Sequence, residues 1–151
     1  MEFIFLLPIF LPLLTSIFLF LNKKLFNELV TNFFTLNGAL LSFAIASYSF
    51  VALALNKFKA VNIELFQWIS NPDISIGFTL DGLSGIMLVL VTGLSFVIQL
   101  FSTSYMEQDE NHSNYFVYFN FFVFSMLLLV MSSNFLVMFF GWELVGLSSY
   151  L

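Results

Sequence analysis

Long apolar stretches without charged side chains constrain the fold of this chain more than any other feature. Five such stretches occur, and they cover residues 3–21, 29–55, 82–102, 115–131 and 134–151, apart from one acid in the last. A helix needs about 20 residues to cross a hydrocarbon core about 30 Å thick. In lipid, only helices and closed barrels satisfy every backbone polar group. The sequence therefore predicts an all-α transmembrane fold with five spanning helices, forming a single membrane domain over residues 1–151.

The composition agrees with this class and removes several kinds of function. The chain is 60% hydrophobic and 9% charged, whereas a soluble domain carries about 25% charged residues. It has no cysteine, which excludes disulfides, zinc–thiolate sites and cysteine-ligated iron–sulfur clusters. One histidine cannot ligate a haem from both sides, and four lysines without arginine make nucleic-acid binding a poor fit. We expect no cofactor or metal site in this chain and contact with membrane lipids.

Residues 56–80 interrupt the helical pattern. Apolar residues alternate with other residues at Val61, Ile63 and Leu65, and the alternation resumes from Ile74 to Leu80. Between the two runs stands a turn-forming cluster, Ser70-Asn71-Pro72-Asp73. A period of two on both sides of a turn predicts a β-hairpin over residues 61–80. It must lie outside the hydrocarbon, because an open sheet edge cannot face lipid. An irregular amphipathic loop is the alternative.

Two patterns in the first pair of helices predict close helix packing. Gly38, Ser42 and Ala46 recur every four residues, and such a stripe of small residues allows another helix to approach closely. Pro8 and Pro12 lie on one face of the first helix. Each proline removes a backbone donor, so a neighbouring helix or water must supply a replacement.

One carboxylate, Glu143, lies within the last apolar stretch. An Asp, Lys or Arg at the centre of a membrane helix costs about 2.5–3.5 kcal/mol, and an ionisable side chain there usually marks a functional site with a partner. Gly146 leaves room beside the acid for water or for a neighbouring helix. Trp142 lies deep instead of at an interface, where tryptophan is usually enriched. Residues spaced by three or four share a helix face, and here these are Phe139, Glu143, Gly146, Leu147 and Tyr150. The alternative is that Glu143 is only a polar contact that holds two helices together.

The remaining charges lie in the connecting loops. The loop over residues 103–114 is predicted to be a solvated acidic turn, and it holds Glu107, Asp109, Glu110 and His112. We interpret His112 as a surface histidine in preference to a pH-sensitive contact. Lys23 and Lys24 lie on one side of the membrane and Lys57 and Lys59 on the other. Because each side has two lysines, the positive-inside rule does not predict which side of the membrane each loop faces.

Three stretches of the sequence resemble a known family. They are DGLSGIMLVLVTGLSFVIQLFSTSYM, YFVYFNFFVFSMLLLVMSSN and FFGWELVGLSSYL. They resemble chain 5 of respiratory NADH:ubiquinone oxidoreductase, the antiporter-like subunit of complex I, and the resemblance is strongest over residues 78–151. The large subunit of multisubunit cation/proton antiporters shares the DGLS and YM elements. That subunit typically lacks the glycine before Trp-Glu and the VGL after it.

The resemblance implies a fold, a function and a setting. The fold is an antiporter-like helical bundle, built in the family from inverted repeats with broken helices. The function is proton translocation in the membrane arm of complex I, with Glu143 as proton relay and Gly146, Trp142 and Tyr150 supporting it. FMN, iron–sulfur clusters and ubiquinone are expected elsewhere in the complex. The location is the mitochondrial inner membrane, with the hairpin in the intermembrane space and the acidic loop in the matrix.

Length is the main departure from the family, whose members continue for several hundred residues more. We therefore expect an N-terminal piece of a split chain 5, with the remainder supplied as a separate polypeptide. All four lysines lie in loops, so a lysine that faces Glu143 must come from that other polypeptide. Two rival functions stay open: the large subunit of a multisubunit cation/proton antiporter, and a structural or assembly membrane protein without a transport role.

Overall fold

The computed structural model describes residues 2–55, 60–70 and 73–151, and of residues 2, 3, 69, 70 and 73 it describes the backbone alone. A short 3₁₀ helix, η1 (Glu2–Leu6), leads into the first α-helix. The remaining elements are α1 (Leu7–Asn22), α2 (Glu28–Ala54), β1 (Val61–Ser70), β2 (Asp73–Leu80), α3 (Gly82–Tyr105), α4 (His112–Val130) and α5 (Phe135–Tyr150).

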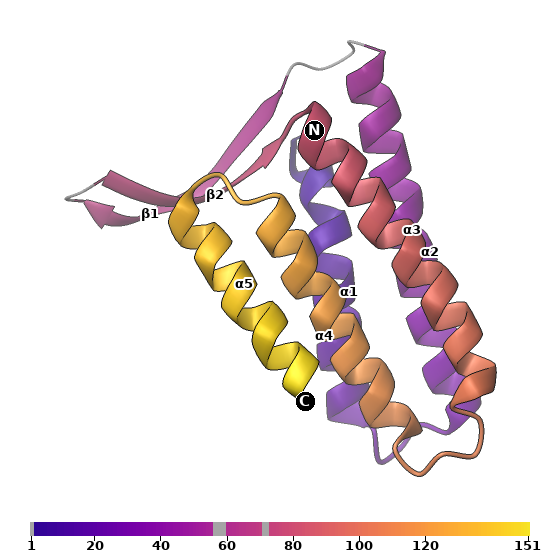
Figure 1. Ribbon diagram of the computed structural model, residues 1–151. Coiled ribbons are helices and arrows are strands. Elements are labelled where there is room, and N and C mark those ends of the chain that lie inside the picture. Colours follow the sequence, from indigo (N-terminus) through magenta and orange to yellow (C-terminus); the bar gives the residue numbers. More distant parts are fainter. Residues whose placement is uncertain (1, 56–59, 71–72) are drawn as a thin grey trace.

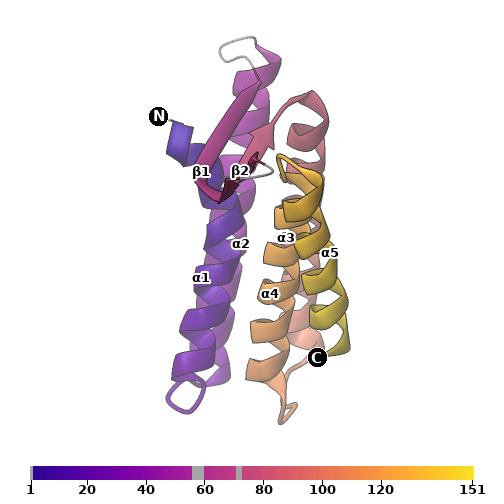
Figure 2. The ribbon, with the colours of Figure 1, turned by 90° about the vertical axis from the view of Figure 1, so that its left-hand side faces the viewer.

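The helices stand side by side, and the two strands form a hairpin at one end of them (Figures 1 and 2). Helix α1 packs against α2 and α4, α3 packs against α2 and α4, and α5 packs against α4. We call the end that carries β1, β2 and residues 131–134 the hairpin end. The opposite end, with residues 23–27 and 106–111, is the loop end. The described chain starts at the hairpin end and finishes at the loop end (Figure 1).

Among the described residues, four helical segments are long and apolar enough to cross a membrane, and they are Ile4–Asn22, α2, α3 and α4. Helix α5 is apolar but has 16 residues. At 1.5 Å per residue it is about 24 Å long, which is short of the roughly 30 Å core. The fifth predicted span is thus present as a helix that falls below the usual spanning length. Helix α4 begins at His112, three residues before the predicted start.

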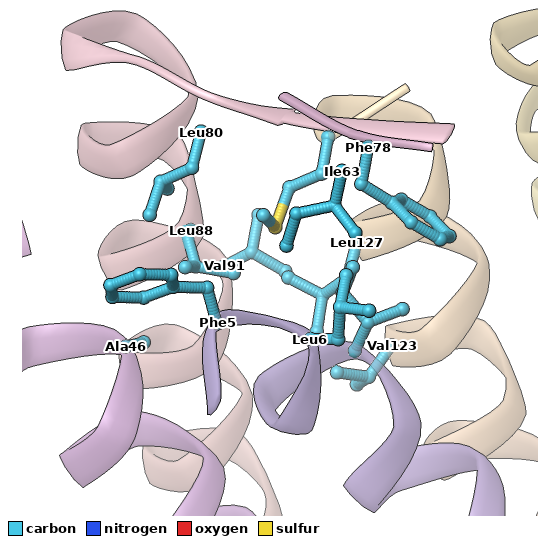
Figure 3. Close-up of a cluster of buried hydrophobic side chains, with 12 residues drawn as sticks. Phe5, Leu6, Ala46, Ile63, Phe78, Leu80, Leu88, Val91, Val123 and Leu127 are labelled. Carbon is cyan, nitrogen blue, oxygen red and sulfur yellow. The ribbon is translucent and has the colours of Figure 1, made fainter. Parts of the chain in front are cut away.

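The predicted hairpin is confirmed. Strands β1 and β2 pair antiparallel, with Val61 opposite Leu80 and Ile63 opposite Phe78. The hairpin packs onto the helix ends through a buried apolar cluster (Figure 3), whose members include Phe5, Ile63, Phe78, Leu80, Leu88 and Leu127. Asn71 and Pro72 of the predicted turn lie outside the described residues, as do Lys57 and Lys59.

The even alternation predicted for β1 is wrong beyond Glu64. The pairing register shifts between Glu64 and Phe66, so the bulge adds one residue to this strand. Leu65 and Phe66 are consequently both exposed, at 40% and 55%. The outer part of the hairpin therefore presents apolar side chains that the bundle does not cover.

Ser42 compensates for the hydrogen bond that Pro12 removes from α1. Proline has no backbone N–H, so Pro12 cannot donate to the carbonyl of Pro8 four residues earlier. The hydroxyl of Ser42, on α2, donates to that carbonyl oxygen at 2.8 Å. The helices can approach this closely because Gly38 faces α1, where a Cβ atom would lie 2.6 Å from Thr15 Oγ1. The small-residue stripe therefore does what the sequence predicted.

We expect Ser42→Ala to lower the free energy of unfolding by about 1 kcal/mol, because it leaves a buried carbonyl unpaired. The matched control is Ser49→Ala on the same helix. Both serines are 1% exposed, but Ser49 donates to the carbonyl of Ile45 in its own helix. The substitution Pro12→Ala gives residue 12 an N–H that can donate to the Pro8 carbonyl. In that background, Ser42→Ala should lower the free energy of unfolding by less. Denaturant unfolding in detergent tests this cycle, and equal losses for both serine variants would contradict it.

Helix α3 starts where the sequence predicted, at Gly82. Asp81 accepts a hydrogen bond from the Ser84 backbone N–H at 2.8 Å, and the Ser84 hydroxyl accepts one from the Asp81 N–H at 2.7 Å. This reciprocal capping box satisfies two donors at the helix start. The hydrogen bonds from the Ser84 backbone and side chain hold the pKa of Asp81 below its ordinary value of 3.8.

Candidate functional site

The hairpin fixes the start of α5, the helix that carries Glu143. The side-chain amide of Asn134 donates to the carbonyl of Ser75 in β2 at 2.6 Å. The amide oxygen of Asn134 caps α5 by accepting from the N–H groups of Leu136 and Val137. The N–H of Thr79 also donates to the carbonyl of Met131 at 2.8 Å. Strand β2 and the α4–α5 turn are therefore joined by backbone and side-chain hydrogen bonds.

Gly141 allows α5 to pack directly on α4. A Cβ atom at Gly141 would lie 2.7 Å from both the Cα and the backbone N of Leu129. On the same side of α5, Val137 and Ser148 are buried, at 4% and 6% exposure. The other faces are set by this contact, because a helix has one orientation about its axis once a backbone-to-backbone approach is fixed.

Glu143 lies in the middle of α5 on the face that turns away from α4. Its neighbours on that surface are large and exposed, with Trp142 at 68% and Tyr150 at 87%. Gly146 is exposed, and a Cβ atom there would meet nothing within 4 Å. Among the described residues, none forms a hydrogen bond or ion pair with the Glu143 carboxylate. The four predicted site residues therefore share one surface, and nothing in the described part of the chain covers it.

The lysines that the structure describes lie in the loop between α1 and α2. Lys23 and Lys24 follow α1 at the loop end, and the ammonium of Lys23 lies 5.0 Å from the centre of the Phe20 ring. Within the described part of the chain, neither lysine pairs with Glu143.

A buried polar cluster, which the sequence patterns did not predict, lies inside the bundle, and we call it the amide cluster. It joins three helices: Thr35 on α2, Gln99 on α3 and Asn120 on α4. The hydroxyl of Thr35 donates to Gln99 Oε1 at 2.9 Å, and the amide of Asn120 donates to Thr35 Oγ1 at 2.7 Å. All three side chains are at most 1% exposed. The available signal in the sequence was an amide or hydroxyl side chain within each of three apolar stretches.

The interpretation of His112 as a surface histidine is wrong. The side chain is 2% exposed, and its ring lies 4.9 Å from the ring of Phe116. The reason is that α4 begins at His112 instead of Tyr115, which turns the imidazole toward the interior of the bundle. The spacing of His112, Phe116 and Asn120, every four residues, was the available signal for a shared face.

Comparison with known proteins assigns the chain to a family. Residues 66–116 match the family model described as "NADH-Ubiquinone oxidoreductase (complex I), chain 5 N-terminus". NADH-quinone oxidoreductase subunit L of Escherichia coli is 37% identical over 147 residues, which are 96% of this chain and 24% of that protein. NADH-ubiquinone oxidoreductase chain 5 of Triticum aestivum is 39% identical over 150 residues, 97% of this chain and 22% of that protein.

Solved structures support the same fold. The membrane-bound sulfane sulfur reductase, described as an archaeal respiratory membrane complex, contains a chain that matches with a TM-score of 0.81 and 23% identity. The match covers 95% of this chain and 28% of that chain. This chain spans about a quarter of the length of the curated relatives. From its sequence matches and its membrane-spanning helices, it is a multi-pass membrane protein that belongs to the family of NADH-ubiquinone oxidoreductase chain 5 and its bacterial counterpart, subunit L.

Proposed function

We propose that this chain is part of a proton-translocating subunit in the membrane arm of respiratory complex I. The observation that carries this proposal is the place of Glu143: a carboxylate in the middle of an apolar helix, on a surface left open by the described residues. An intramembrane acid is expensive and marks an ion or proton path by default. The match to the chain 5 and subunit L family supports the same conclusion.

In this proposal Glu143 binds and releases a proton. Helices from outside residues 1–151 cover the surface formed by Trp142, Glu143, Gly146 and Tyr150, and one of them brings a lysine close to the carboxylate. When the lysine is near, the charged carboxylate is favoured and the proton leaves. When the lysine moves away, desolvation favours the neutral acid and a proton is taken up. Gly146 keeps space for water or for the covering helix.

The setting follows from the same proposal. The chain lies in the mitochondrial inner membrane, with the hairpin end in the intermembrane space and the loop end in the matrix. Its partners are the other membrane-arm subunits. FMN, iron–sulfur clusters and ubiquinone act in other subunits, and their redox chemistry supplies the energy for translocation.

Co-purification tests the proposal against its rivals. A tag on this chain should isolate an assembly that contains flavin and iron–sulfur absorbance and that reduces quinone with NADH. A sodium- or potassium-dependent antiporter assembly without flavin would identify the cation/proton antiporter function instead. Isolation of an incomplete assembly without quinone reductase activity would favour a structural or assembly role and overturn the proposal.

A further inference from the structure

The loop end of the bundle contains buried polar atoms that no described residue pairs with. Both ring nitrogens of His112 and the hydroxyl of Thr31 are buried and have no hydrogen-bond partner among the described residues. Thr31 is 1% exposed and His112 is 2% exposed. A buried polar group without a partner costs free energy that a bound hydrogen-bonding molecule can recover.

Helix geometry gives the approximate heights of these two side chains along the bundle. Helices α2 and α4 both run from the loop end toward the hairpin end (Figure 1), and Thr35 is hydrogen-bonded to Asn120. Counting back from that bond at 1.5 Å per residue, Thr31 lies about 6 Å and His112 about 12 Å nearer the loop end. Thr31 shares the Thr35 face and His112 shares the Asn120 face. The unpaired atoms therefore lie between the amide cluster and the loop end.

A pocket opens at the loop end beside His112. It has a volume of about 600 Å³, and its lining includes Glu28, Asp109, Glu110 and His112. Two of these carboxylates come from different segments, Glu28 from α2 and Asp109 from the α3–α4 loop. A water molecule occupies about 30 Å³ in the liquid, so the pocket has ample room for water to reach the ring. The pocket, the imidazole, Thr31 and the amide cluster therefore follow one another along the bundle.

We propose that His112 and Thr31 form a binding site for ordered water that connects the pocket at the loop end with the buried amide cluster. The chemistry of the site fits water better than a metal, because no three metal-binding side chains gather anywhere in the described part of the chain. A neutral imidazole offers one donor and one acceptor, and a threonine hydroxyl offers both. A buried water typically makes about three hydrogen bonds to such groups. The site is separate from Glu143 and does not depend on its role.

Deuterium exchange at the imidazole C2–H tests this site in the assembled complex. His112 is the only histidine of the chain, so its peptide reports this ring alone by mass spectrometry. The ring should exchange in D₂O, and Thr31→Val should slow the exchange several-fold, because valine keeps the shape and removes the hydroxyl. Thr92→Val is the matched control: Thr92 is 1% exposed, and its hydroxyl donates to the Leu88 carbonyl of its own helix. In the Thr92→Val variant, the His112 ring should exchange at the same rate as in the unmodified protein.

Two results would overturn the proposal. One is a His112 ring that takes up no deuterium in the unmodified complex, under conditions in which the histidine of an unfolded reference peptide exchanges fully. The other is the same rate for Thr31→Val and Thr92→Val. If Thr31→Val fails to assemble, a cryo-EM map of the unmodified complex decides: water must lie within hydrogen-bond distance of the imidazole and Thr31 Oγ1. Neither measurement uses proton pumping, so a failure here is distinct from a failure of the role proposed for Glu143.

Discussion

Glu143→Gln is expected to leave the complex assembled and to remove most of its proton translocation. Glutamine keeps the shape of the side chain and can hydrogen-bond, but it cannot release a proton. Reconstituted vesicles provide the measurement, with NADH oxidation and internal acidification recorded together. Tight coupling would lower both rates, whereas loose coupling would lower the number of protons moved for each NADH oxidised.

Two further variants make this result specific. Glu64→Gln removes a carboxylate from the exposed part of β1 and should translocate normally, which controls for the loss of one negative charge. Glu143→Asp keeps a titratable group on a shorter side chain and should retain part of the activity. The proposed role of Glu143 fails if the glutamine variant pumps at the unmodified rate. It also fails if a structure of the complex shows the carboxylate facing lipid without a polar neighbour.

Gly141→Ala is expected to cause the largest loss of stability among single-methyl changes to α5. The added Cβ would lie 2.7 Å from backbone atoms of Leu129, and backbone cannot move aside as a flexible side chain can. Overpacking of this kind typically costs about 1–3 kcal/mol. The helix would have to move away from α4, taking Glu143 with it. Thermal unfolding in detergent and the yield of assembled complex measure the effect.

The control for this prediction is the same substitution five residues later. At Gly146 an added Cβ would meet nothing within 4 Å of the described chain, so Gly146→Ala should leave the melting temperature of the isolated chain unchanged or slightly raised. In the complex, the same variant reports whether another helix lies against that surface. Equal melting temperatures for Gly141→Ala and Gly146→Ala would show that α5 does not pack on α4 through Gly141.

Local patterns were enough for the features that depend on one segment alone. Uncharged apolar stretches predict helices because a lipid-embedded backbone must satisfy its own hydrogen bonds. The period of two around residues 70–73 predicted the hairpin, and the small residues at 38, 42 and 46 predicted a close helix contact. The helix period also placed Glu143 and Gly146 on one face. These inferences needed only the spacing of side chains along a single helix or strand.

The tertiary structure decided which groups meet. Gly141 and Gly146 look alike in the sequence, yet Gly141 lies against Leu129 and Gly146 faces open space. Ser42 and Ser49 lie on one face of α2, yet only Ser42 reaches a carbonyl of another helix. His112 follows an acidic loop and looks exposed in the sequence, yet the start of α4 buries its ring. In each case the residue type and its spacing were visible, but its partner belonged to a distant segment whose position depends on how the helices pack.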